Sequence, residues 1–165
     1  TTYLMIPVGQ GKCLCIEVIE SSALNRSVPP LGQETPLTLG GGAAKVLLTF
    51  ADPVQRQWTL SQADAAGAGH GLGESELRNQ IREIALRRYA VTTEEYAAGV
   101  DALGVPIWDQ TGTVIAALGL VGPTSRMRAR LQSDFPEVLL GAARDISARL
   151  AGDPNRPPEA DLTGL

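Results

Sequence analysis

Hydrophobic residues near the start of the chain fall into short runs that are typical of β-strands. Segments 1–8 and 12–20 are rich in Leu, Ile, Val and Cys, and the Gly-Gln-Gly turn at 9–11 between them predicts a hairpin. Both segments carry apolar residues at odd and even positions, so we expect the sheet to be covered on both faces. A third, weaker strand is predicted over 23–29, where two prolines end it.

A second group of strand-like segments follows the middle of the chain. Strands are predicted over 89–93, 98–109 and 113–121, and 109–112 carry the Asp-x-x-Gly pattern of a hairpin turn. The last of these strands is almost wholly apolar but contains Gly119, a residue that adds no packing to a strand. Two explanations are open: a bulge or close backbone contact, or something other than protein over Gly119.

Helical spacing of apolar residues marks most of the remaining chain. The helix predicted over 74–89 carries Leu77, Ile81, Ile84 and Ala85 at the i, i+4, i+7 and i+8 positions of one face. Shorter helical pieces are predicted over 42–51, around Trp58 and Leu60, and on either side of Pro136. About six strands, mostly linked by hairpins, together with these helices predict an α+β fold on an antiparallel sheet.

Composition narrows the functional classes. With 165 residues and 44% hydrophobic content the chain suits one domain, and with 4% aromatics its core must be aliphatic. The formal charge of −4 and the lack of basic clusters argue against direct contact with nucleic acid. We find no apolar stretch of the roughly 20 residues that a membrane span needs. Nor does the sequence open on a signal peptide. A cytoplasmic location is therefore expected.

The sequence contains no group of residues whose types and spacing predict a catalytic site. His70 is the one histidine, and it lies in the glycine-rich segment 61–73, which is expected to be a mobile loop. Cys13 and Cys15 would point to the same face of a strand about 6 to 7 Å apart, a poor geometry for a disulfide. They are interpreted as core residues in a reducing compartment. Neither a metal site nor a cofactor is predicted.

Three weak features point instead to binding of a small molecule. Gly40–Ala43 start a helix, where small residues leave backbone N–H groups open to an anion; close packing of helix on sheet is an equal explanation. Gly119 shares a face with Val121 by strand alternation. Thr92 enters the turn that follows the strand 89–93.

The segment 87–126, "RRYAVTTEEYAAGVDALGVPIWDQTGTVIAALGLVGPTSR", closely resembles the effector-binding domain of IclR-type transcriptional regulators. The resemblance extends upstream through "PLTLGGGAAKVLL" and forward to "ARDIS" at 143–147, with an apparent extra residue between Pro36 and Lys45. It implies a GAF-like fold: a six-stranded antiparallel sheet with helices on both sides and a ligand cup on one face.

The resemblance also implies which residues would line the cup in this chain. The backbone amides at the start of the helix would come from Gly42 and Ala43. At the positions where relatives that bind acids carry polar side chains, this chain would have a threonine, an alanine, a glycine and a valine. The residues assigned to the site are Gly42, Ala43, Thr92, Ala102, Gly119, Val121 and, by a looser alignment for the apolar wall, Leu24 and Val28. A larger, drier cup with Gly119 as its floor is expected, suited to a ligand with an apolar body.

The expected organisation is an effector-binding and oligomerising domain over 1–151 followed by a flexible tail over 152–165. A winged helix-turn-helix would precede it in a longer protein, and DNA would be contacted only through that missing part. Partners implied by the resemblance are a carboxylate or aromatic effector and further copies of the chain, as dimer or tetramer. Two alternatives are a thiol-dependent enzyme on the same fold, using Cys13 or Cys15, and a dimerisation module without a ligand.

Overall fold

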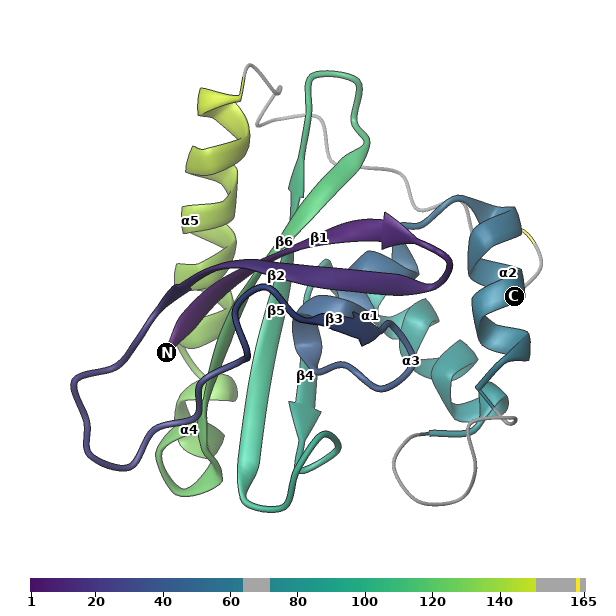
Figure 1. The fold of residues 1–165 in the computed structure, drawn as a ribbon. Helices are drawn as coiled ribbons and strands as arrows, with labels where there is room; N and C mark the ends of the chain where they lie inside the picture. Colours follow the sequence, from purple (N-terminus) through teal and green to yellow (C-terminus); the bar gives the residue numbers. More distant parts are fainter. Residues whose placement is uncertain (64–71, 151–162, 164–165) are drawn as a thin grey trace.

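The computed structural model describes residues 1–63, 72–150 and 163. Within this part of the chain, six strands form one antiparallel sheet in the order β3-β2-β1-β6-β5-β4 (Figure 1). The strands are β1 (Thr2–Gly9), β2 (Lys12–Ile19), β3 (Glu34–Pro36), β4 (Ala90–Thr93), β5 (Val100–Trp108) and β6 (Val114–Pro123). The helices are α1 (Gly42–Thr49), α2 (Pro53–Ser61), α3 (Glu74–Arg87), α4 (Thr124–Leu131) and α5 (Phe135–Arg149). The predicted α+β fold is confirmed.

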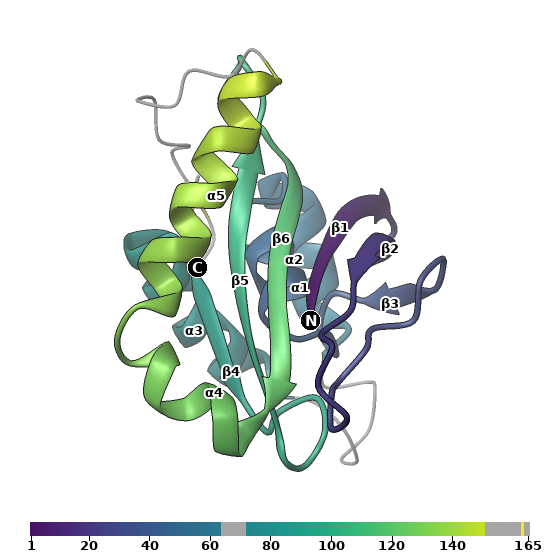
Figure 2. The ribbon, with the colours of Figure 1, turned by 90° about the vertical axis from the view of Figure 1, so that its left-hand side faces the viewer.

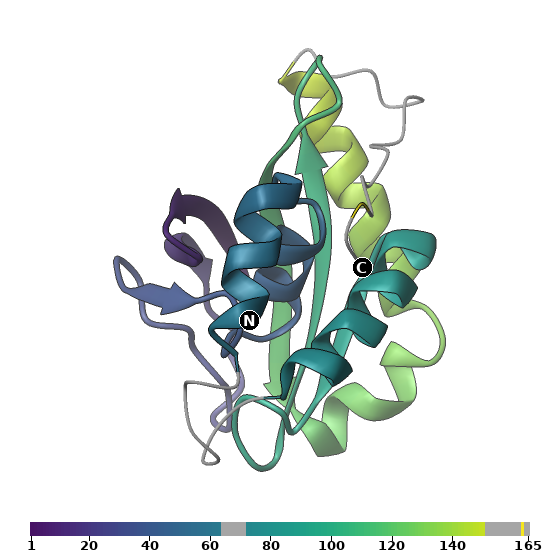
Figure 3. The ribbon, with the colours of Figure 1, turned by 90° about the vertical axis from the view of Figure 1, so that its right-hand side faces the viewer.

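Helices cover both faces of the central strands. α1 packs against β5, β6 and β4, with α2 and α3 beside it, whereas α4 and α5 pack on β5 and β6 from the opposite side. Figures 2 and 3 show the two helical layers from either edge of the sheet. One cluster of buried apolar side chains lies under α1 and a second under α4 and α5. The expectation that both faces of the sheet are covered is confirmed for these strands.

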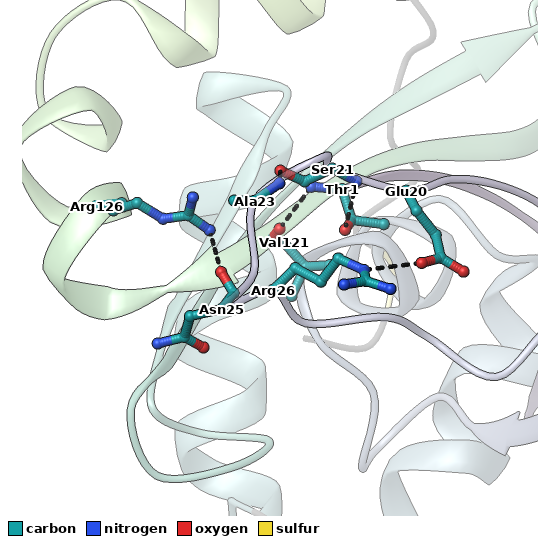
Figure 4. A network of polar contacts seen from close by, with 8 residues as sticks. All are labelled: Thr1, Glu20, Ser21, Ala23, Asn25, Arg26, Val121 and Arg126. Carbon is teal, nitrogen blue, oxygen red and sulfur yellow. Dashed lines mark hydrogen bonds and ion pairs between the residues drawn. The ribbon is translucent and has the colours of Figure 1, made fainter.

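The third strand lies later in the chain than predicted. Residues 23–29 form part of a loop, and the strand that pairs with β2 is β3. Figure 4 shows how the loop is held: the backbone N–H of Ser21 donates to Thr1 Oγ1 at 3.3 Å, and an Arg126 guanidinium nitrogen donates to the Asn25 carbonyl at 2.6 Å. Two prolines at the loop's end lack the N–H that a ladder needs, which explains why pairing resumes only after them.

The hairpin between β5 and β6 forms as the sequence predicted. The Asp109 carboxylate accepts from the backbone N–H groups of Thr111 at 2.8 Å and Thr113 at 3.1 Å. Gly112 completes the turn with φ of +82°, a conformation that glycine adopts without a steric penalty. These local bonds fix the register in which β5 and β6 run together, and β6 carries Gly119 into the sheet at a position opposite Gly104.

A pair of glycines sets the distance between α1 and the sheet. A Cβ on Gly104 of β5 would lie 2.2 Å from the carbonyl carbon of Gly42 and 2.3 Å from the backbone nitrogen of Ala43. A Cβ on Gly42 would in turn lie 2.6 Å from the Gly104 nitrogen. Backbone therefore meets backbone at this crossing. Of the two explanations for the helix-start glycines, close packing of helix on sheet accounts for Gly42.

Some predicted features lie outside the described residues. These are His70 with most of the glycine-rich segment 61–73, and the tail predicted at 152–165 apart from Thr163. Among the described residues, no helix is both long and apolar enough to cross a bilayer. The same part of the chain contains no group of three or more His, Cys, Asp or Glu side chains arranged to hold a metal ion.

Candidate ligand-binding site

A cavity of about 150 Å³ lies between the sheet and the start of α1. Its floor consists of alternate residues of the strands, which include Met5, Thr92, Ala102 and Val121. The loop at 27–30 and the β4–β5 connection at 96–97 supply two walls, and Gly40 and Gly41 close the end next to α1. A dry cavity of this volume in an engineered protein takes up one benzene molecule, so the space suits a single ring.

The cavity is lined mainly by apolar groups, and its polar side chains are the hydroxyl-bearing Ser27, Thr35, Thr92, Tyr3 and Tyr96. No Asp, Glu, Lys, Arg or His of the described chain lines it. A Cβ on Gly41 would lie 3.5 Å from Ala102 Cβ, 3.7 Å from Thr92 Oγ1 and 3.9 Å from Tyr3 Oη, so these groups converge beside the start of α1. Thr92 is only 2% exposed. Its hydroxyl lies beside the cavity, where it can bond to a guest.

Gly119 does not face an empty space. It pairs with Tyr3 across β1 and β6, and a Cβ on Gly119 would lie 2.1 to 2.5 Å from three ring carbons of Tyr3. The phenol ring therefore lies on the glycine and fills the volume that a side chain would need. The expectation that something other than protein occupies this position, with Gly119 as the floor of a cup, is wrong; the close contact is with a side chain of the same chain.

The other predicted site residues divide into two groups. Thr92, Ala102, Val121 and Val28 do line one cavity, although they come from three strands and a loop. Those that do not line it are Gly42, Ala43, Gly119 and Leu24.

Leu24 was expected in the apolar wall, but it is 100% exposed, because residues 23–29 form a loop rather than a strand and only Val28 turns inward. Gly42 packs on β5, as described above. Ala43 is completely buried, and its backbone N–H acts to lower the pKa of the Tyr3 hydroxyl. The residues that line the cavity at this end, Gly40 and Gly41, come just before the helix.

Sequence reasoning missed Tyr3, Met5 and Tyr96 as lining residues. Alternation along β1 placed Tyr3 and Met5 on one face, which was a usable signal. Alternation could not show whether that face of β1 lies toward the cavity or toward the opposite side of the sheet. The register that sets Tyr3 beside Gly119 joins residues more than a hundred positions apart, so no local pattern contains it.

A buried ion pair ties the wall at 96–97 to α1. Lys45 of α1 is 3% exposed, and its ammonium donates to Glu95 and to the side-chain oxygen of Gln80 on α3. Burial lowers the pKa of Lys45, and the hydrogen bond to Glu95 opposes that shift. Because Glu95 immediately precedes Tyr96 and Ala97, this pair holds the β4–β5 connection against the helix beside the cavity.

The two cysteines are poorly placed for catalysis. Cys13 and Cys15 are unpaired thiols in β2, and they are 0% and 1% exposed. Burial raises the pKa of Cys13 to about 12, with a smaller contribution from Cys15, and burial also raises the pKa of Cys15. The thiolate is the nucleophilic form of cysteine, so neither group is activated.

Both thiols are therefore expected to resist alkylation in the folded chain. Iodoacetamide at about pH 8 should label them roughly a hundredfold more slowly than in urea, since reaction needs an accessible thiolate. The rate is measured by mass spectrometry of the intact chain over time. Rapid labelling of either cysteine under native conditions would contradict this expectation and favour the thiol-dependent enzyme.

Comparison with known proteins shows the family to which this chain belongs. The family model for the bacterial transcriptional regulator IclR C-terminal domain matches residues 1–148, nearly the whole described chain. The chain belongs to the IclR family.

Curated IclR-type relatives are similar over much of the chain. It is 30% identical over 137 residues to the HTH-type transcriptional regulator KdgR of Dickeya chrysanthemi, covering 82% of this chain and 45% of that protein. It is 27% identical over 144 residues to the HTH-type transcriptional repressor AllR of Escherichia coli K12, covering 85% of this chain and 52% of the relative. The chain thus spans about half the length of these regulators.

Solved structures agree with the assignment. The IclR protein of Thermotoga maritima superposes with a TM-score of 0.80 at 23% identity, covering 90% of this chain and 60% of that one. An IclR-family transcriptional regulator from a Rhodococcus species is 32% identical, with a TM-score of 0.74, and covers 90% of this chain and 56% of that one. The likeness to the Thermotoga protein establishes the shared fold, and the family match establishes an IclR C-terminal domain.

Proposed function

We propose that this domain is the ligand-sensing and oligomerising part of an IclR-type regulator, and that it works by binding rather than by catalysis. Its effector is a small organic molecule with an apolar body that occupies the cavity beside α1. The observation that carries this proposal is the ring-sized apolar space with the buried Thr92 hydroxyl at its polar corner. A hydroxyl that faces an apolar cavity can bond to a guest, and a single polar group of this kind would orient it.

The proposed mechanism couples occupancy of the cavity to the arrangement of subunits. The cavity is walled by two connections, 27–30 and 96–97, which are held by separate polar contacts. A guest that orders these walls would favour one arrangement of a dimer or tetramer over another, by no more than its difference in affinity for the two. In the longer regulator that arrangement would set the distance between the DNA-binding domains, which must match the separation of the operator half-sites.

Calorimetry of this chain with phenol, benzoate, glyoxylate and pyruvate tests the proposal. We expect at least one ring compound to bind more tightly than either keto acid, because the cavity is apolar and no charged side chain of the described chain lines it. Tighter binding of glyoxylate or pyruvate would overturn the preference for an apolar body. No binding across the panel would favour the dimerisation module without a ligand.

The Thr92 hydroxyl gives a sharper prediction. Thr92→Val removes the hydroxyl at nearly constant volume and should weaken binding of phenol by about 1 kcal/mol, or roughly fivefold, the net value of one hydrogen bond. Thr93→Val is the matched control, since Thr93 is exposed and does not line the cavity. Equal affinities of the two variants would show that Thr92 makes no bond to the guest.

A further inference from the structure

Tyr3 occupies the place that a bound aromatic molecule would take. Its ring lies against Gly119, where even a methyl group would come within 2.1 Å of the ring carbon that carries the hydroxyl. Tyr3 is 5% exposed and lines the cavity at the end nearest α1. The glycine on β6 and the tyrosine on β1 are thus complementary in shape.

The hydroxyl of Tyr3 takes up the hydrogen-bonding position at the start of α1. Tyr3 Oη would lie 3.9 Å from a Cβ on Gly41, the residue that precedes the helix, and the nearby backbone N–H of Ala43, at its second position, lowers the pKa of the phenol. Free N–H groups and the positive end of the helix dipole attract anions to this position. Burial raises the pKa of Tyr3, and the Ala43 hydrogen bond only partly opposes that, so the group stays a neutral phenol.

We propose that Tyr3 determines the effector specificity of this domain by acting as an internal ligand. Its ring and hydroxyl occupy the position in which the helix amides would otherwise hold a carboxylate. The space that remains, about 150 Å³ with Thr92 as its polar group, takes a neutral single ring. This inference rests on the proposed sensor function and narrows its ligand class from carboxylates and aromatics to neutral aromatics.

Titration of phenol and benzoate tests the inference, since the two probes share a ring and differ in charge. The intact chain is expected to bind phenol at least about tenfold more tightly than benzoate, because a carboxylate would be buried without a partner. In Tyr3→Ala the benzoate ring can lie on Gly119 and its carboxylate can accept from Ala43, so the affinity for benzoate should rise at least about tenfold. Tyr89→Ala is the matched control, because it removes a tyrosine that does not line the cavity and should leave the affinity for benzoate unchanged.

Two further measurements keep the inference testable if Tyr3→Ala does not fold. Tyr3→Leu keeps an apolar side chain and should raise the affinity for benzoate in the same direction by a smaller factor. Gly119→Ala should lower the melting temperature of the intact chain more than that of the Tyr3→Leu variant, because the three atoms nearest the new methyl group are ring carbons of Tyr3.

The outcomes separate this inference from the sensor function. Binding of phenol and benzoate to the intact chain with equal affinity would overturn the role of Tyr3 and leave the sensor function standing. The same holds if the affinity for benzoate rises as much in Tyr89→Ala as in Tyr3→Ala. If neither the intact chain nor any variant binds either compound, both proposals fall.

Discussion

Replacing Gly104 by alanine is expected to lower the free energy of unfolding by at least about 3 kcal/mol, at the upper end of the cost of overpacking a core. The new methyl group would come within 2.2 to 2.4 Å of three backbone atoms of Gly42 and Ala43. These atoms belong to α1 and cannot rotate away as a side chain does, so the whole helix must move off the sheet. Urea denaturation followed by circular dichroism measures the loss.

The same displacement would also alter the cavity, since Gly41 and the Ala43 amide move with the helix. Gly141→Ala is the matched control, because a Cβ there meets nothing within 4 Å and the residue lies within α5. Alanine is the better helix former, so this variant should be more stable by about 0.5 to 1 kcal/mol. Equal stability of Gly104→Ala and Gly141→Ala would show that α1 does not rest on β5 through the two glycines.

Changing Glu95 to glutamine is expected to cost about 3 kcal/mol of stability, in the lower part of the range for breaking a buried ion pair. Lys45 is 3% exposed and would keep its charge in the interior with only the neutral oxygens of Gln80 and the new amide as partners. The β4–β5 connection should detach first, because this pair holds it to α1. Thermal unfolding gives the loss of stability, and titration of phenol should show weaker binding.

Glu83→Gln provides the comparison on the surface. Glu83 and Arg87 form an ion pair at 3.3 Å on α3, with side chains 63% and 58% exposed. Pairs of this kind contribute little, so the change should stay within about 0.5 kcal/mol. If the two glutamine variants lose the same stability, the buried pair does not act as the tether of the cavity wall.

Much of the secondary structure of this protein could be predicted because local interactions produce it. The β5–β6 turn is made by the Asp109 carboxylate and Gly112 within five residues, and the long helix follows the spacing of Leu77, Ile81 and Ile84. Strand alternation likewise placed Gly119 and Val121 on one face of the last strand. The strand predicted at 23–29 failed because its weak apolar pattern did not outweigh the prolines and the side-chain contacts that hold it as a loop.

The sequence by itself determined the family, the sheet with its helices, and four of the residues that line the cavity. Only the tertiary structure decided what each glycine faces: Gly42 meets the backbone of Gly104, and Gly119 meets the ring of Tyr3. Glycine has no side chain to indicate a partner, and both contacts join residues that are far apart in the chain. What fills the space beside a glycine is therefore fixed by strand register and helix placement, which exist only once the chain has folded.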